Sequence, residues 1–518
     1  MADDPSRLEA TLRTGNGAYS EAISVSQKAI NRNLEILLAL YPELGEIGLK
    51  THDGDMSAKV DSPQVALQVA GSNRGTVYYY CRFKEGTVEP WDDELNSNAP
   101  PIDVTGWVLA FSVDIAAVNV PEDSDDYQNA TSVINQPGDY SISRLYLDFN
   151  IHHVKVGDGV NGVMSEPKKT TIGYTMKANN PGTVNPHAPT FPPTSFIFQT
   201  YEYIAPRTTE PHQGLDEEGD KNHLLYLEMT QHLDFPIQRF LPYSGNFVTP
   251  PMDGTICISK DIFFGSYLLR KKEPLLLNVF NKYTYAWIAD HKAYDDDPVR
   301  FTADLRVGLG SSHDQDIDFF GFEEVNTADT PKWEWKRSES TFDNPKAVNL
   351  NCDASNKTTL FPKPGTNELL LTGESQIKFK FNSWPIYLFG GAQGTEASAT
   401  ATWSLTITLN SVMEGGLEIS LNVPENQQHL FKISTYFDDW PDLASYPPYE
   451  EHLKQRMADA ITGVPLRDIA NDLQKALSNS AKFVIPGGGT FFYKDPIFNN
   501  HGDVLIEAEY NGQVTQTP

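Results

Sequence analysis

The feature that most constrains this chain is its pattern of a few helical runs among long stretches of strand-like alternation. One run, residues 20–41, carries apolar side chains at multiples of three and four: Ile23, Ile30, Leu34, Leu37 and Tyr41. This is the spacing of a buried helical face, so the run predicts one long amphipathic helix. Long helices against extended sheets can wall off an apolar space, which favours a protein that holds a hydrophobic partner.

Composition excludes several classes of function. The 518 residues suffice for two to four domains or for one elongated unit. With 69 acidic and 40 basic residues the formal net charge is −29, which disfavours nucleic acid and anionic membrane surfaces as partners. Such a surface suits a soluble protein or one that meets a basic partner. The three cysteines, Cys81, Cys257 and Cys352, are far apart and indicate buried thiols rather than disulfides or zinc ligands.

The beginning of the chain, MADDPSRLEA, is acidic and polar, unlike a signal peptide, and no apolar run approaches the ~18 residues of a membrane span. We therefore expect a soluble protein made in the cytoplasm, with release by another route left open. Residues 1–16 are expected to form a flexible leader. Residues 17–518 are expected to form one elongated unit, which would divide into two subdomains near 300–365 if it divides at all.

Alternating apolar residues predict strands along most of the chain. The expected strands cover 76–83, 106–120, 144–156, 223–230, 254–259, 376–381, 431–437 and 503–510, with a hairpin over 399–423. Further helices are expected from Ser259 onward and over 449–462 and 466–477, whereas 121–140, 157–221 and 325–365 look like loops. Strands and helices in this order favour an α+β protein over parallel βαβ units.

No recognised catalytic signature is present: the sequence lacks GxSxG, HExxH, a phosphate-binding loop and GxGxxG at a strand–helix junction. The run His313–Asp318 gathers an imidazole and three carboxylates, which hard cations prefer, but it lacks the glycine and distal glutamate of an EF-hand. A solvated acidic loop is the favoured interpretation. We therefore expect no catalytic residue, no metal site and no cofactor.

One apolar helix face stands out as a candidate ligand site. Ser259 is placed to cap a helix, and the side chains that follow on one face are Ile262, Phe263, Tyr267 and Leu269. A packed core and the lining of a lipid channel use the same residue types, so both interpretations stay open. They differ in whether space is left beside these side chains.

Two short segments resemble a known family. Residues 19–38, YSEAISVSQKAINRNLEILL, resemble the opening of the clostridial forty-seven-kilodalton neurotoxin-cluster proteins and their OrfX relatives, in which a short strand runs into a helix. Here Ser24-Val25-Ser26 precede Ile30-Asn31 and Leu34. Residues 255–264, TICISKDIFF, resemble the strand-to-helix junction of the same family.

This resemblance implies a tubular lipid-binding (TULIP-like) fold, with elongated, strongly curved antiparallel sheets wrapped around long amphipathic helices. It also implies binding of a lipid or another hydrophobic ligand without catalysis, and often a role beside toxins. The first hypothesis is therefore a non-enzymatic lipid binder, with a toxin-accessory protein as one form of it. The alternatives are a structural component that binds a basic protein through its acidic surface, and a hydrolase built from distant carboxylates.

Overall fold

The computed structural model of the chain contains two compact units. It describes residues 4–69, 74–124, 127–128, 140–148, 171–178, 193–206, 208–209, 214–269, 277–293, 301–316, 318–325, 331–344, 348–383, 393–412, 416–421, 431–438, 455, 457–459, 468 and 491–510. Unit 1 comprises Met1–Ile262, Ser411–Leu417 and Ser478–Pro518; unit 2 comprises Phe263–Asn410 and Glu418–Leu477. Along the chain the units change after Ile262, Asn410, Leu417 and Leu477, and none of these positions lies within 300–365, where the sequence suggested a subdomain boundary.

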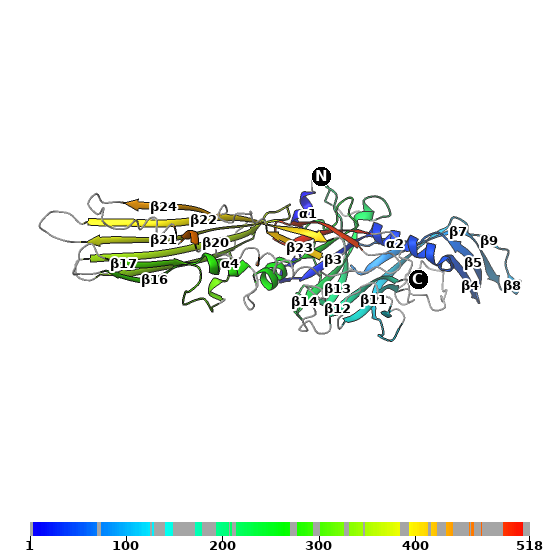
Figure 1. Cartoon of the computed structure of the whole chain (residues 1–518). Helices are drawn as coiled ribbons and strands as arrows, with labels where there is room; N and C mark the ends of the chain where they lie inside the picture. Colours follow the sequence, from blue (N-terminus) through cyan, green and yellow to red (C-terminus); the bar gives the residue numbers. More distant parts are fainter. Residues whose placement is uncertain are drawn as a thin grey trace. The chain divides into compact units, whose positions relative to one another are not determined.

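Unit 1 contains a six-stranded antiparallel sheet with the order β13-β14-β3-β15-β26-β25. Figure 1 shows β13, β14 and β3 of this sheet. Its strands are β3 (Glu21–Ser26), β13 (Pro193–Tyr201), β14 (His223–Thr230), β15 (Gly254–Ile258), β25 (Phe491–Phe498) and β26 (Val504–Tyr510). Every residue of β3, β14 and β15 is buried. The strands expected at 223–230, 254–259 and 503–510 are confirmed, and their apolar runs reflect burial on both faces.

The helix predicted over residues 20–41 is wrong in its first third. Glu21–Ser26 form the central strand β3, and helix α2 covers only Gln27–Leu40. Ser26 marks the change, because its Oγ accepts a hydrogen bond from the backbone N of Ala29 at 3.1 Å and caps the helix. The strand-then-helix order implied by the family resemblance is therefore the correct one. Pro42 ends α2 as expected and begins the 3₁₀ turn η1 (Pro42–Gly45).

The N-terminal segment packs into unit 1, in contrast to the flexible leader expected over residues 1–16. Helix α1 (Pro5–Glu9) is capped by Asp4, and the strands β1 (Arg13–Thr14) and β2 (Gly17–Ala18) form a small hairpin. Ala10 and Leu12 belong to one core cluster with side chains of the six-stranded sheet. The other buried members of that cluster are Tyr19, Ala22, Tyr201, Leu225, Leu227, Met229, Leu241, Phe247, Cys257 and Leu505.

Unit 1 also contains a nine-stranded sheet, with the main order β12-β11-β10-β7-β5-β4 and three short strands beside β7. Its strands are β4 (Glu46–Thr51), β5 (Gly54–Val60), β6 (Gln64–Leu67), β7 (Thr76–Asp92), β8 (Ser97–Asn98), β9 (Ile102–Asp103), β10 (Val108–Asn119), β11 (Tyr140–Asp148) and β12 (Thr171–Ala178). The strands expected at 76–83 and 106–120 lie here, as does the beginning of the one expected at 144–156, whose residues after 148 lie outside the described part of the chain. Residues 157–221, expected to be loops, contain β12, β13 and the 3₁₀ turn η2 (Gly219–Lys221).

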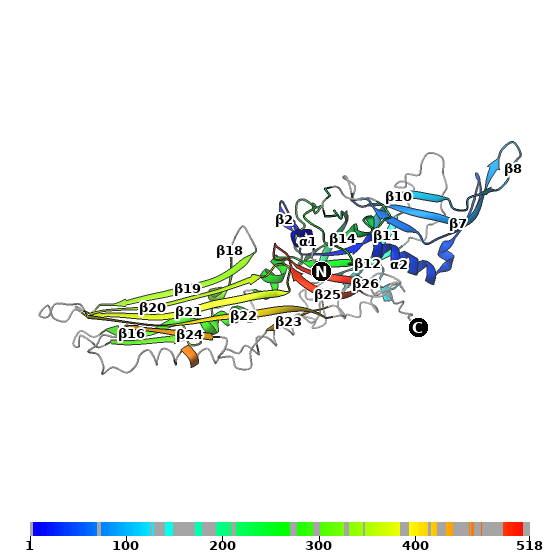
Figure 2. The same cartoon turned by 90° about the horizontal axis from the view of Figure 1, so that it is seen from above.

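Unit 2 contains most of a seven-stranded antiparallel sheet with the order β18-β19-β20-β21-β22-β23, and β24 pairs with β22. The strands are β18 (Glu323–Val325), β19 (Lys332–Asp343), β20 (Val348–Pro362), β21 (Glu368–Ser383), β22 (Gln393–Val412), β23 (Gly416–Leu421) and β24 (Phe431–Asp438). Figure 2 shows β19 to β22 running side by side, and Figure 1 shows β20 to β22 in the same arrangement. At 20 residues β22 is far longer than the average strand of about five or six.

The prediction of a loop over 325–365 is wrong, because this segment contains the whole of β19 and β20. Their outward side chains are mainly lysine, serine, threonine and asparagine, whereas Trp333, Trp335, Cys352 and Leu360 are buried. The apolar half of the alternation is thus diluted by small and polar residues, which hides the strands in the sequence. The expected strands at 376–381 and 431–437 and the hairpin partners within 399–423 are confirmed.

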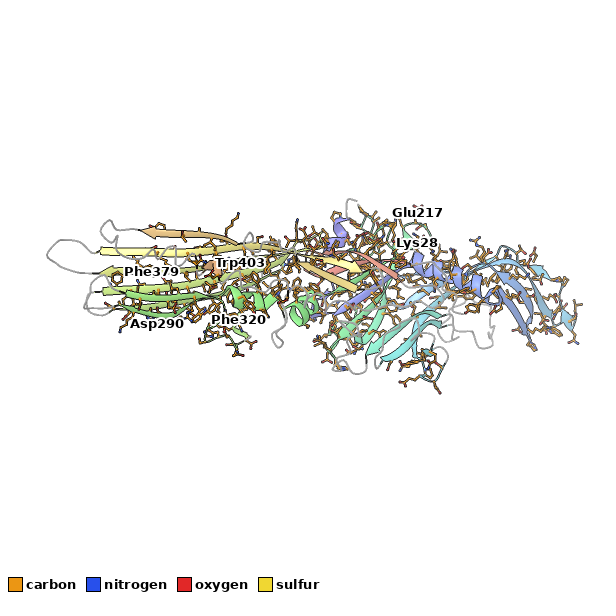
Figure 3. All side chains as sticks on the ribbon, viewed as in Figure 1. Lys28, Glu217, Asp290, Phe320, Phe379 and Trp403 are labelled. Atoms are coloured by element: carbon orange, nitrogen blue, oxygen red, sulfur yellow. The ribbon has the colours of Figure 1, made fainter. Side chains whose placement is uncertain are left out.

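The core of unit 2 lies between its long sheet and the elements packed against it, helix α4 (Leu277–Thr284), the hairpin β16 (Ala286–Ala293) and β17 (Phe301–Val307), and the turn η4 (Asp318–Phe320). Figure 3 shows Phe379 on β21 and Trp403 on β22. The Trp403 ring meets that of Phe280 on α4 edge-to-face at 5.7 Å. Asn356 fixes the hairpin, since its side chain exchanges hydrogen bonds with the backbone N and O of Ala286.

The prediction of long amphipathic helices is not met in the part of the chain that the structure describes. The longest helix there is α2, with 14 residues. The helix expected from Ser259 is an eight-residue π-helix, η3 (Asp261–Leu268). The helices expected over 449–462 and 466–477 fall almost entirely outside the described residues. The mainly antiparallel architecture is confirmed, and no helix among the described residues is long and apolar enough to cross a membrane.

Candidate functional site

The residues singled out from the sequence lie where β15 runs into η3. The backbone N of Ile262 approaches Ser259 Oγ at 3.4 Å, so the predicted cap is present. Ile262, Phe263 and Leu269 are buried. The Phe263 ring meets Phe264 edge-to-face at 5.1 Å, and Phe264 in turn stacks on Trp333 at 3.9 Å.

These contacts are those of packed aromatic side chains, and the side chain of Tyr267 lies outside what the structure describes. The contacts do not separate an ordinary core from a ligand lining. A ligand-binding role for Ile262, Phe263, Tyr267 and Leu269 therefore stays a prediction, and a substitution at Phe263 tests it.

The acidic run His313–Asp318 uses its polar groups within its own loop. Asp314 accepts hydrogen bonds from the backbone N of Gly310 at 2.7 Å and from Ser311 Oγ at 3.1 Å. His313 stacks on Phe319 with ring centroids 3.8 Å apart. Among the described residues, no group of three or more histidine, cysteine, aspartate or glutamate side chains is placed to hold a metal ion.

An open groove lies on the nine-stranded sheet beside helix α2. It has a volume of about 410 Å³. Its lining residues come from α2, from the segment around β6, from β7 and β10, and from the turn before η2: Glu35, Asp61, Ser62, Gln64, Tyr80, Arg82, Val108 and Leu215. The volume is in the range of about 300–1,000 Å³ that small-molecule sites occupy.

Strand register explains why these side chains share one face. Tyr80 on β7 pairs with Gln64 on β6, and Arg82, two residues further on the same strand, pairs with Val108 on β10. Residues two apart on a strand, and residues directly opposite each other, point to the same side of a sheet. The backbone N of Asp61 donates a hydrogen bond to the Arg82 carbonyl at 2.9 Å. This hydrogen bond places Asp61 beside Arg82 at the groove.

Two buried amides hold α2 against this sheet. Asn31 donates from Nδ2 to the Val65 carbonyl at 3.1 Å and accepts from the Val65 backbone N at 2.7 Å. Gln27 accepts from the backbone N of Leu67 at 2.8 Å and donates to the Gly214 carbonyl at 2.7 Å. Glu35 lies one helical turn beyond Asn31, so the first contact positions Glu35 at the groove. The second contact positions the turn that carries Leu215.

The groove leaves apolar surface in contact with water. Val108 retains 46% and Leu215 37% of their surface exposed, and Trp107 and Leu109 beside Val108 are also exposed. The Oγ of Ser62 is buried and has no hydrogen-bond partner within the described parts of the chain. The groove thus combines an apolar wall with two carboxylates, one guanidinium and the Ser62 hydroxyl, which has no hydrogen-bond partner among the described residues.

Sequence reasoning missed this groove. The run 106–120 is predicted to form a strand. It is a strand, but its first residues, Val108 to Ala110, are exposed. The signal that could have marked the site is the cluster of large apolar residues at the start of that run. The contributions of Glu35 and Leu215 come from distant parts of the sequence and carried no signal.

A second unusual feature of unit 1 is a buried pair of carboxyl groups. Glu21 on β3 and Glu228 on β14 are cross-strand partners, and the Oε2 atoms of both lack a hydrogen-bond partner among the described residues. Burial raises the pKa of Glu228 to about 8. Burial, and then the charge of Glu228, raise the pKa of Glu21 well above its ordinary value. The pair therefore retains a proton near neutral pH, because two buried carboxylates side by side are costly.

No family model matches the chain, and no curated protein sequence matches it. Among solved structures the chain is similar to P47 of Clostridium botulinum E1, with 10% identity, a TM-score of 0.46, and coverage of 95% of this chain and 99% of that one. It is also similar to P47 from Clostridium botulinum A2, with 11% identity, a TM-score of 0.44, and coverage of 95% and 97%.

A lipopolysaccharide binding protein aligns with 8% identity and a TM-score of 0.32, over 96% of this chain and 100% of that chain. The P47 proteins are the family that the short segments of the sequence resemble. The similarity is one of fold and does not extend to a ligand.

Proposed function

We propose that this protein binds a lipid or another hydrophobic ligand without catalysing a reaction on it, and that the groove beside α2 receives this ligand. The observation that supports the proposal is the exposure of Val108 and Leu215 in a hollow of about 410 Å³. Apolar side chains held at an open hollow gain free energy when a ligand displaces the water against them.

The lining favours an amphipathic ligand. The ring of Tyr80 and the aliphatic side chains of Val108 and Leu215 offer an apolar wall, and Ser62 and Gln64 offer hydrogen bonds to a polar group. Such a division between apolar contacts and a few polar groups is typical of small-molecule sites. One end of the ligand would then lie on the apolar wall while the other is hydrogen-bonded.

The charges of the lining residues restrict which polar headgroup the ligand can carry. Glu35 and Asp61 contribute two carboxylates, and Arg82 contributes one guanidinium. A headgroup with several negative charges would meet a net negative lining and bind poorly. A zwitterionic or uncharged headgroup is favoured, because Arg82 can pair with its negative part while a carboxylate meets its positive part.

The experiment measures binding of a fluorescent phosphatidylcholine to the full chain. The double variant Val108→Thr, Leu215→Ser removes apolar contact while keeping side-chain size at residue 108, and we expect at least about a tenfold weaker affinity. The matched control is Leu95→Ser, which removes an exposed leucine between β7 and β8 outside the groove. Equal affinity of wild type and double variant would refute the assignment to the groove.

The same samples test the absence of catalysis. Glu35 and Asp61 are the carboxylates that a hydrolase at this site would use. Mass spectra of the lipid before and after incubation with the protein should be identical. If the lipid loses its ester or headgroup with the wild-type protein but not with Glu35→Gln, the groove is a hydrolase site and not a binding site alone.

A further inference from the structure

A second surface of unit 1, separate from the groove, is formed by residues 231–241, QHLDFPIQRFL, which follow strand β14; we call this segment the apolar loop. Its ends are fixed by side chains of β13. The backbone N of His232 donates to Thr194 Oγ1 at 3.0 Å, and Gln199 exchanges two hydrogen bonds with the backbone of Leu241 at 2.8 and 3.0 Å. The hydroxyl of Tyr19 donates to the Arg239 carbonyl at 2.7 Å.

The backbone of the loop begins in an unfavourable conformation. Gln231 and His232 have φ angles of +56° and +58°, a region that residues with a side chain rarely adopt. Such a conformation persists where the surrounding contacts enforce it. The path of the apolar loop is therefore built by the fold.

This path divides the apolar side chains of the loop into two sets. Phe235 packs on Tyr19 of the core with ring centroids 6.2 Å apart, and Leu241 is fully buried. Leu233 and Phe240 keep 48% of their surface exposed and Ile237 keeps 87%. The second set covers no core, and its contact with water is unfavourable.

One arginine lies directly beside this exposed set, and a second lies in the loop itself. The guanidinium of Arg74 lies 5.4 Å from the centre of the Phe240 ring and donates to the Leu241 carbonyl at 3.2 Å. The guanidinium of Arg239 lies 5.9 Å from the ring of Phe235. Arg74 also approaches Glu202 at 3.8 Å. Apolar side chains next to arginines suit a phospholipid surface, in which hydrocarbon lies beneath phosphate groups.

We propose that the apolar loop docks unit 1 on a phospholipid surface by inserting Leu233, Ile237 and Phe240, with Arg74 and Arg239 at the level of the phosphates. A stable protein–protein interface needs about 800 Å² and 20–30 residues on each partner. Three side chains of one loop offer much less, whereas insertion into a bilayer needs no complementary partner surface. A chain with net charge −29 is repelled by anionic lipids, so the surface is zwitterionic.

The test is flotation of the full chain with phosphatidylcholine vesicles. Ile237→Asp places a charge at the most exposed apolar position of the loop, where folding is not at stake, and we expect at least about a tenfold loss of vesicle-bound protein. Arg239→Gln should reduce binding by a smaller factor. Leu95→Asp is the matched control, an exposed leucine outside the loop, and should bind like wild type.

Two results would overturn the proposal: a wild-type chain that does not float with the vesicles, or an Ile237→Asp variant that floats as well as wild type. Sedimentation velocity without lipid tests whether the apolar loop contacts a second copy of the chain instead of a vesicle. If wild type self-associates and Ile237→Asp does not, while neither binds vesicles, the loop contacts a second copy instead. The groove variant Val108→Thr, Leu215→Ser should float normally, so docking and ligand binding can fail independently.

Discussion

Glu21 and Glu228 lie directly opposite each other on the paired strands β3 and β14, and both side chains are buried. Neither strand is at an edge of the six-stranded sheet, since β13 and β15 flank them. The two carboxyl groups are therefore held together by the pairing itself. A buried ionised carboxylate is costly, and a second one beside it more so, which is why the pair keeps a proton at a pH where exposed glutamates have none.

This pair predicts that stability falls as the pH rises. Because the folded-state pKa of Glu228, about 8, lies above the ordinary value of 4.5, the folded chain holds a proton that the unfolded chain has released between these values. The free energy of unfolding should therefore decline across this range, by at most about 1.4 kcal/mol per pH unit for one proton. Glu228→Gln should flatten the decline, measured by denaturant unfolding from pH 5 to 8.5. The exposed Glu85→Gln should follow wild type, and parallel curves for Glu228→Gln and wild type would contradict the prediction.

Glu334 on β19 predicts the opposite pH dependence for unit 2. Hydrogen bonds from Lys332 and Lys336 lower the pKa of Glu334 to about 2. The stabilisation is complete above pH 4.5, the ordinary value, and is lost as the pH falls towards 2. Glu334→Gln should destabilise unit 2 at neutral pH and weaken its dependence on pH between 2 and 5, followed by thermal unfolding. Glu374→Gln, exposed on the same sheet, is the control. An unchanged acid profile in Glu334→Gln would show that the lysines do not hold its charge.

A substitution at Phe263 separates the two interpretations of the helix face chosen from the sequence. Phe263 is fully buried, so Phe263→Ala should lower the free energy of unfolding by about 3–5 kcal/mol if it is core. Phe342→Ala, at an exposed phenylalanine, should change it by less than about 0.5 kcal/mol. If Phe263 instead lines a ligand space, its loss should cost little stability and should reduce the amount of lipid that co-purifies, seen by native mass spectrometry.

Asn31 should matter both for stability and for the groove. Asn31→Ala leaves the backbone N and O of Val65 without their side-chain partner, which should cost about 1–3 kcal/mol. Because Glu35 lies one turn further on α2, affinity for the fluorescent phosphatidylcholine should also fall. Lys28→Ala, at an exposed position of the same helix (labelled in Figure 3), should change neither quantity appreciably. A loss of stability without any loss of affinity would show that α2 does not shape the groove.

Much of the fold could be predicted from the sequence where the local pattern is compatible with only one secondary structure. The run His223–Thr230 is apolar and rich in large side chains, and it forms β14 over those residues. Gln376–Phe381 alternates strictly and lies within β21. The strands within 325–365 could not be predicted, because the solvent-facing residues of β19 and β20 are polar and give the segment the composition of a loop. Only the structure shows that the tryptophans between them are buried.

The candidate site was less predictable than the fold. The helix face around Phe263 was visible because its members are close in sequence, and the structure shows it packed with aromatic neighbours. The groove joins Glu35, Arg82 and Leu215, which no spacing rule connects. Its parts meet only because β7 pairs with β6 and β10 and because Gln27 and Asn31 hold α2 and the Gly214 turn in place.

By itself the sequence determined the mainly antiparallel β content, the end of α2 at Pro42 and the acidic charge, because each depends on local propensity or on composition. Only the tertiary structure decided that Glu21–Ser26 form a strand. Ile23 and Val25 fit a helix or a strand equally well by pattern, and the choice falls to the strand because β14 and β15 supply hydrogen bonds on both of its edges. The same pairing places Glu21 beside Glu228, a contact between residues about two hundred positions apart that no local pattern encodes.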